Sequence, residues 1–135
     1  MFEFGKLSKW KKMKARYDKG EIDVQTFVDT MKDTTLYCST PVGEDKDGKP
    51  RLYALTNSQT NDGYYPAFLS KEHCARFFTA MGRNGFMIIE NNLQDVLQAL
   101  DCDEMLSKLG VIVEPDDACE MVVSPGIRVS KQALP

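Results

Sequence analysis

The sequence is poor in the residues from which most catalytic and metal sites are built. It has one histidine, His73, and its four cysteines lie 36, 28 and 17 residues apart, without the close Cys-x-x-Cys pair of a zinc knuckle. His73 and Cys74 are adjacent, so on a helix they point about 100° apart and form a poor pair of ligands. We therefore expect no metal and no cofactor, and we favour buried free thiols over disulfides.

Catalytic and phosphate-binding motifs are also lacking. Neither Gly-x-Gly-x-x-Gly nor the Gly-x4-Gly-Lys-Ser/Thr phosphate loop occurs. Cys74 lies near the start of a predicted helix, but on the apolar face of that helix, which disfavours a reactive nucleophile. Acidic residues cluster in predicted loops and helix junctions, where solvated charge explains them. We expect that the chain is not an enzyme.

Long apolar runs are missing as well. No stretch approaches the roughly 20 apolar residues that a membrane helix requires, and no apolar segment of a secretory signal follows the N-terminal lysines. With 42% hydrophobic and 27% charged residues, the composition is typical of a globular protein. These observations predict a cytoplasmic location.

Charge is distributed unevenly along the chain. Residues 1–20 hold seven Lys and Arg against two acidic residues, a net charge of +5. Because the whole chain carries −3, the remainder carries −8. An acidic body with a basic N-terminal segment is the clearest global feature of the sequence.

Hydrophobic periodicity predicts an α+β fold, in which helices pack on a mixed, mostly antiparallel sheet and a basic helix precedes it. Good capping residues mark the starts of three helices after the first one. Asp23, Ser70 and Asn92 are the expected N-caps, and Gly110 is expected to end the last helix. The predicted helices are 2–17, 23–32, 70–81 and 93–109, the last with a break at 101–103.

The predicted strands are 35–40, 52–55, 64–69, 86–89, 111–113 and 119–123. The charged loop 43–50 is expected to join 36–40 to 52–56 as a hairpin. A second hairpin would turn at 57–63, with Asp62-Gly63 supplying the positive φ. Pro66 lacks an N–H, so its strand is expected at an edge, or with the proline nitrogen on an unpaired side. The run 86–89 predicts a strand buried on both faces.

Two segments carry a family resemblance. Tyr65-Pro66-Ala67-Phe68-Leu69-Ser70 leads from a strand into a helix, and Leu93–Leu109 is followed by Gly110, an apolar strand and Glu114-Pro115. The stretch from Thr34 to Val123 thereby resembles the N-terminal domain of SseB-family proteins, with Glu114 in place of the usual Asn. The resemblance implies an SseB-like α/β domain at 34–135 and a link to serine sensitivity, secretion or toxin–immunity systems in bacteria. It does not cover the N-terminal helical segment at 1–33, which the apolar spacing predicts. It carries over no catalytic residue.

The sequence favours a protein-binding role. Tyr53, Tyr64 and Tyr65 surround a polar loop, which suits protein recognition, and Trp10, Lys11 and Lys14 form a possible second surface. An acidic body would complement a basic partner, for example a nuclease toxin.

Three alternatives stay open. A small ligand or substrate could occupy a pocket at the sheet edge. The basic residues 1–20 could bind an anionic membrane surface or, less readily because of the acidic body, a nucleic acid. The first helix could also simply pack its Trp10 face on the domain and turn its lysines to water. Independently of this, Tyr53, Tyr64 and Tyr65 could belong to an ordinary hairpin and lie half-buried on a face of the sheet.

Overall fold

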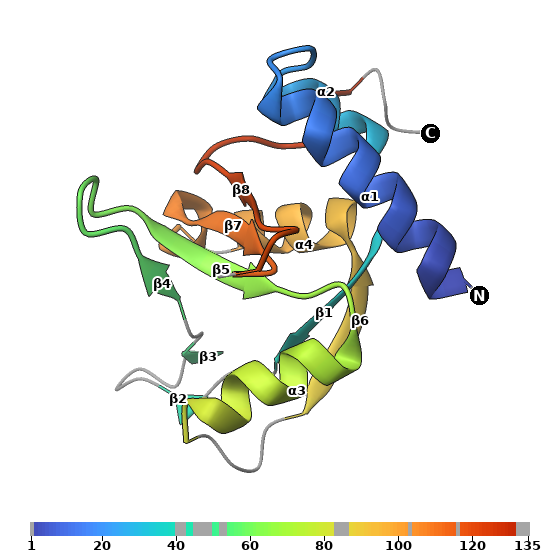
Figure 1. Ribbon diagram of the computed structural model, residues 1–135. Helices are drawn as coiled ribbons and strands as arrows, with labels where there is room; N and C mark the ends of the chain where they lie inside the picture. The colour runs from blue at the N-terminus through green and yellow to red at the C-terminus, as the bar shows by residue number, and fades with distance from the viewer. Residues whose placement is uncertain are drawn as a thin grey trace.

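The computed structural model describes residues 2–39, 43–44, 50–51, 54–82, 87–102, 104–115 and 117–131 (Figure 1). These residues form an α+β fold with four α-helices and mixed sheets, as predicted. The helices are α1 (Phe2–Asp18), α2 (Val24–Thr30), α3 (Lys71–Ala80) and α4 (Leu93–Ala99), with the 3-10 turns η1 (Leu100–Cys102) and η2 (Leu106–Lys108). The strands are β1 (Thr35–Ser39), β2 (Gly43–Glu44), β3 (Pro50–Arg51), β4 (Leu55–Thr56), β5 (Gly63–Ala67), β6 (Ile88–Asn92), β7 (Gly110–Val113) and β8 (Met121–Val123).

The helix starts follow the predicted caps. The side chains of Asp23, Ser70 and Asn92 accept hydrogen bonds from the backbone N–H three residues later, at 2.8, 3.1 and 2.8 Å. Each cap satisfies a donor that the first helical turn leaves unpaired. Gly20 follows α1 with a φ of +77°, a left-handed conformation that glycine adopts without steric cost.

The largest sheet has the strand order β4-β5-β7-β8. β5 and β7 run parallel, with Tyr65 opposite Val111, while the outer pairs of this sheet are antiparallel. On the far side of β5, Tyr64 pairs with Leu55, and Phe68 exchanges backbone hydrogen bonds of 2.7 and 2.9 Å with Tyr37. The backbone N–H and C=O groups of successive residues point to opposite sides of a strand. The Pro66 nitrogen therefore points to the same side of β5 as the Phe68 nitrogen, at a position that follows the residues paired with β4. The expectation of an edge strand is wrong for the described residues, because β5 lies between β4 and β7. The placement of the proline nitrogen on an unpaired side stays a prediction, since Tyr53 lies outside the described residues.

β1 was predicted to pair with 52–56, and this is wrong for the described residues. β1 pairs over its whole length with β6, with Cys38 opposite Ile89. The predicted hairpin is present only at its tip, where Gly43–Glu44 pairs with Pro50–Arg51. β1 therefore has β6 along one edge and an isolated bridge from Tyr37 to Phe68 at the other.

The prediction of a strand buried on both faces at 86–89 is also wrong for the described residues of that run. β6 pairs with β1 alone, so it is an edge strand. Met87 is 71% exposed and Ile89 38% exposed, and only Ile88 packs against a buried cluster.

Two predicted glycine roles are corrected. The positive φ of the β4–β5 turn belongs to Asn61, at 63°, and not to Gly63. Gly110 does not end a helix but begins β7, where a Cβ would lie 2.3 Å from the Val123 carbonyl oxygen and 2.7 Å from the Tyr64 ring. Close approach of neighbouring strands therefore requires glycine at this position.

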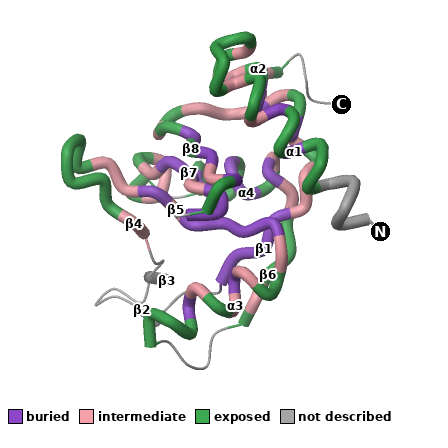
Figure 2. Tube along the Cα trace, viewed as in Figure 1, coloured by how far each residue is buried: buried purple, intermediate pink, exposed green. Residues whose placement is uncertain are grey.

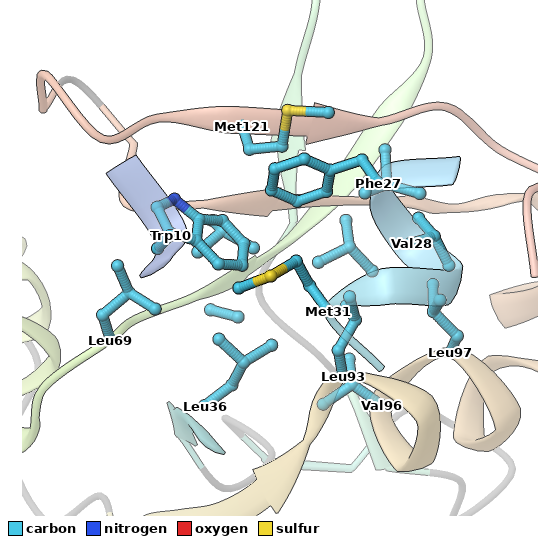
Figure 3. Close-up of a cluster of buried hydrophobic side chains, with 14 of the residues drawn as sticks. Trp10, Phe27, Val28, Met31, Leu36, Leu69, Leu93, Val96, Leu97 and Met121 are labelled. Carbon is cyan, nitrogen blue, oxygen red and sulfur yellow. The ribbon is translucent and has the colours of Figure 1, made fainter. Parts of the chain in front are cut away.

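Two buried clusters lie on opposite faces of β1. The larger cluster joins α1, α2 and α4 to β5, β7 and β8, with Trp10, Phe27 and Met31 at its centre (Figure 3). The smaller one holds α3 against β1 through Cys74 and Phe78. Figure 2 shows β1 and β5 as mostly buried, and the half-buried positions are Thr35, Gly63 and Tyr65. The helical segment 1–33 thus shares its core with the rest of the molecule.

The C-terminal residues 124–131 run across α2. Asp29 accepts hydrogen bonds of 2.8 Å from both the backbone N–H and the hydroxyl of Ser130, and the Gln25 amide donates to the Arg128 carbonyl at 2.7 Å. Arg128 also pairs with Asp101 at 3.0 Å. None of the helices in the described ranges combines the length and the apolar character that a membrane crossing requires.

Candidate functional site

The outer side of α1 carries a row of cations. Trp10 and Met13 are buried and Tyr17 is half-buried, which fixes one side of the helix against the body. On the opposite side lies a set of exposed cations that we call the basic face: Lys9, Lys11, Lys12, Arg16 and Lys19. Figure 2 shows this side of α1 exposed.

Trp10 anchors the helix and is not available to a partner. Its side chain is 0% exposed, its Nε1–H donates to the Cys119 carbonyl at 2.9 Å, and its ring meets Phe27 edge-on with centroids 4.9 Å apart. The prediction of Trp10 as a binding residue is therefore corrected. Its indole ring is buried and its N–H is already hydrogen-bonded, so a partner could contact neither.

The predicted lysines lie differently. Lys11 is exposed on the basic face. Lys14 is partly buried at the edge of the packed side, and its Nζ lies 2.7 Å from the Asp18 carboxylate one turn later. Of the two, Lys11 is the one whose charge faces solvent without a carboxylate partner among the described residues.

The predicted tyrosine surface is not assembled as expected. Tyr64 is buried against Gly110, and burial raises the pKa of its hydroxyl. Tyr65 is half-buried, and its hydroxyl donates to the Ser39 carbonyl at 3.3 Å. Tyr53 lies outside the described residues. The residues 57–61 of the loop are exposed, but the structure does not present Tyr64 beside them as a contact residue.

The structure reveals a hydrogen-bonded pair that the sequence did not predict, between His73 and Glu114. It lies where the parallel strands β5 and β7 end. β5 leads through Ser70 into α3, whose first turn holds His73, and β7 leads directly into Glu114. His73 Nδ1 lies 3.0 Å from Glu114 Oε1 and 3.2 Å from Oε2, and the Leu69 N–H donates to Oε1 at 3.1 Å.

Two hollows, each of about 300 Å³, flank this pair. His73, Arg76 and Glu114 line both hollows. The first, the aromatic hollow, also has Phe68, Phe77, Ala80, Pro115 and Asp117 in its wall. The second, the Leu7 hollow, lies between α1 and the start of α3 and includes Leu7, Leu69, Ser70 and Glu72.

Two of the cysteines, Cys38 and Cys119, are unsuited to nucleophilic chemistry. Cys38, Cys74 and Cys119 are buried, and Cys102 is exposed. Burial raises the pKa of Cys38 to about 12 and also raises that of Cys119. With raised pKa values, Cys38 and Cys119 stay protonated at neutral pH. They are therefore poor nucleophiles, because the thiolate is the reactive form of cysteine. Within the described ranges, no group of three His, Cys, Asp or Glu side chains is placed to hold a metal ion.

A sequence signal for the His73–Glu114 pair was present but weak. His73 is the one histidine of the chain and falls in a first helical turn, and Glu114 ends an apolar strand at the position where the resemblance has Asn. Neither signal indicates that the two residues, 41 positions apart, would meet.

A scan against protein-family models, a search of curated proteins and a search of solved structures each gave no match. Membership of the SseB family therefore stays a prediction from the sequence resemblance.

Proposed function

We propose that this chain is a non-enzymatic protein-binding domain that binds an acidic partner protein through the basic face of α1. The observation that carries the proposal is the placement of the cations. Lys9, Lys12 and Lys19 are exposed and have no carboxylate within ion-pair distance among the described residues.

The spacing of these cations works against the helix itself. Lys9, Lys12 and Arg16 follow one another on α1 at intervals of three and four residues, and Lys19 follows in the turn after the helix, so that neighbouring cations lie close together. Like charges at this spacing destabilise a helix by about 0.2–0.5 kcal/mol per pair. Among the described residues, the one carboxylate near the Arg16 charge is that of Glu21, with 3.7 Å between Arg16 Nε and Glu21 Oε1. An acidic partner would remove this repulsion, so charge complementarity supports binding.

The packing of α1 favours a protein over a membrane. A helix that binds a membrane surface inserts its apolar side between the lipids. In α1 that side is committed to the core, since Trp10 is 0% and Met13 8% exposed. Nucleic acid is disfavoured because residues outside 1–20 carry a net charge of −8 and would repel phosphates.

Some of the expectations from the sequence stay predictions. They are the SseB-family link, the secretion or toxin–immunity setting, the basic partner for the acidic body, and the cytoplasmic location. The basic face carries the proposal without them.

Charge reversal on α1 tests the proposal. The tagged full chain, the variant K9E/K12E/K19E and the matched control K71E/K108E/K131E are used to capture partners from lysate, and mass spectrometry identifies the captured proteins. The control makes the same change in net charge at exposed lysines outside α1. A supporting result is an acidic protein that is lost with the α1 variant and kept with the control.

The captured protein is then purified and titrated by calorimetry. We expect binding to weaken at least tenfold in K9E/K12E/K19E and with rising salt, since exposed charges are screened. Equal binding by both variants would refute the proposal. So would binding of a DNA duplex or of anionic vesicles without any protein partner.

A further inference from the structure

The His73–Glu114 pair lies at a position where sheets commonly bind ligands. Ligands in open α/β sheets bind beyond the carboxyl ends of adjacent parallel strands. In this molecule β5 and β7 are parallel neighbours, and their carboxyl ends lead to α3 and to Glu114. Both hollows open at this point and share His73, Arg76 and Glu114.

Glu114 is held in this position at a cost. It is 3% exposed, and its φ of 54° places a residue with a Cβ in the left-handed region. Such conformations cost about 1–3 kcal/mol and cluster at functional sites. The carboxylate is satisfied by the Leu69 N–H and by His73, so it acts on its neighbours and not on solvent.

The carboxylate fixes which nitrogen of His73 carries a proton. Nδ1 must be an N–H to donate to Glu114 at 3.0 Å. Nε2 lies on the other side of the ring, and the side chain is 41% exposed. Among the described residues Nε2 has no hydrogen-bond partner, so it can bind a ligand.

Arg76 lies one helical turn after His73 and lines both hollows. It is exposed and has no carboxylate within 4.0 Å among the described residues. Two acids line the aromatic hollow: Asp117 accepts from the Cys119 N–H at 2.9 Å, and Glu114 is paired with His73, whereas Glu72 lines the Leu7 hollow. The groups left over are therefore a guanidinium, an imidazole and an aromatic wall formed by Phe68 and Phe77.

These groups match one kind of ligand. A guanidinium binds a carboxylate through two parallel hydrogen bonds, and aromatic rings pack against a flat apolar group. We propose that the aromatic hollow binds a small carboxylate that carries a flat apolar group, with Arg76 on the carboxylate, Phe77 against the apolar part and the His73 ring in the wall of the hollow beside them. Glu114 is a positioning residue that orients His73.

The single histidine makes the test direct. The full chain is labelled with 15N, and the His73 ring signals are followed by long-range 1H–15N spectra during titration at constant ionic strength. Benzoate is the probe, benzamide is its neutral analogue, and acetate is a carboxylate without the ring. We expect saturable shifts with benzoate, weaker binding of acetate and no saturation with benzamide.

Two variants distinguish a specific contact between Arg76 and benzoate from a general effect of removing one positive charge. Arg76→Gln should weaken benzoate binding about tenfold or more, because a charge-assisted contact is lost, whereas Lys71→Gln, on the same helix but outside the hollows, should bind as the wild type does. The proposal is overturned if benzoate gives no saturable shift, if benzamide or acetate binds as tightly, or if the two variants behave alike. None of the basic-face lysines lines either hollow, so this outcome is independent of the proposed function.

Discussion

A single carboxylate, that of Glu114, ties the start of α3 to the end of β7. It receives one backbone donor and one imidazole donor while buried at 3% exposure. A charged group in such a place is stable only because both donors reach it. The residue therefore controls the chemistry of its neighbour as well as the geometry of the turn.

Glu114→Gln tests this control. The amide oxygen at the Oε1 position can still accept from the Leu69 N–H, and the amide NH₂ at the Oε2 position, 3.2 Å from His73 Nδ1, would favour an unprotonated Nδ1 as its acceptor. We expect the His73 proton to move to Nε2, which long-range 1H–15N spectra at neutral pH report directly. The free energy of unfolding should fall by about 1–3 kcal/mol as the charged hydrogen bonds weaken.

Glu72→Gln is the matched control, because Glu72 is an exposed acid in the same helical turn. It should leave the His73 tautomer unchanged. An unchanged tautomer in Glu114→Gln as well would show that the carboxylate does not orient the ring.

At the scale of elements, the C-terminal segment is held on α2 by Asp29. Burial alone would raise the pKa of this carboxyl, but hydrogen bonds from the Ser130 N–H, the Ser130 hydroxyl and Gln25 outweigh burial and lower the pKa below its ordinary 3.8. A carboxyl with a depressed folded pKa stabilises the folded state above about pH 4. This contribution is lost as the pH falls through the folded pKa.

Asp29→Asn should therefore reduce stability at pH 7 by about 1 kcal/mol and by less at pH 3, as measured by urea unfolding at both values. The reason is that wild-type Asp29 becomes protonated at the lower pH. Its charged hydrogen bonds then contribute less to the free energy of unfolding, and the substitution removes less. Asp33→Asn, an exposed acid next to Lys32, serves as control and should change little. An equal loss for Asp29→Asn at both pH values would contradict the explanation.

Helix starts were predictable because a cap is a local feature. Asp23, Ser70 and Asn92 each bond to an N–H three residues on, so sequence alone contains the whole interaction. Strand partners were not predictable in the same way. Cys38 pairs with Ile89, which is far away in the sequence. The segment 52–56 was the simpler expectation, because strands that are consecutive in the sequence usually pair.

The binding surface was predicted only in part for the same reason. Lys11 could be placed outside by helical periodicity, but Trp10 and Tyr64 were assigned to a surface because an amphipathic aromatic suits both a core and an interface. Their burial depends on β7 and β8, whose position no local pattern specifies. His73 and Glu114 meet only because β5 and β7 run parallel.

At the scale of the whole molecule, α1 is part of the core and not an appendage. Trp10→Phe should lower the free energy of unfolding by about 1–3 kcal/mol, because the buried Cys119 carbonyl loses its donor. Urea unfolding followed by circular dichroism and by amide exchange in β7 and β8 should show one shared transition.

Lys11→Gln, a neighbouring exposed position, is the control and should stay within about 0.5 kcal/mol of the wild type. Loss of α1 structure while β7 and β8 remain protected would contradict a shared core. For the same reason, deletion of residues 1–20 would unfold the domain, and charge reversal is the cleaner way to test the basic face.

The hydrogen bond between Trp10 and Cys119 spans 109 residues of sequence. During synthesis at about 5–20 residues per second, α1 leaves the ribosome about 5–20 s before its acceptor exists. During that interval the apolar side of α1 can pack against Phe27 of α2, but β7 and β8, which complete its core, are still missing. The core of the N-terminal segment is therefore completed only when nearly the whole chain has been made.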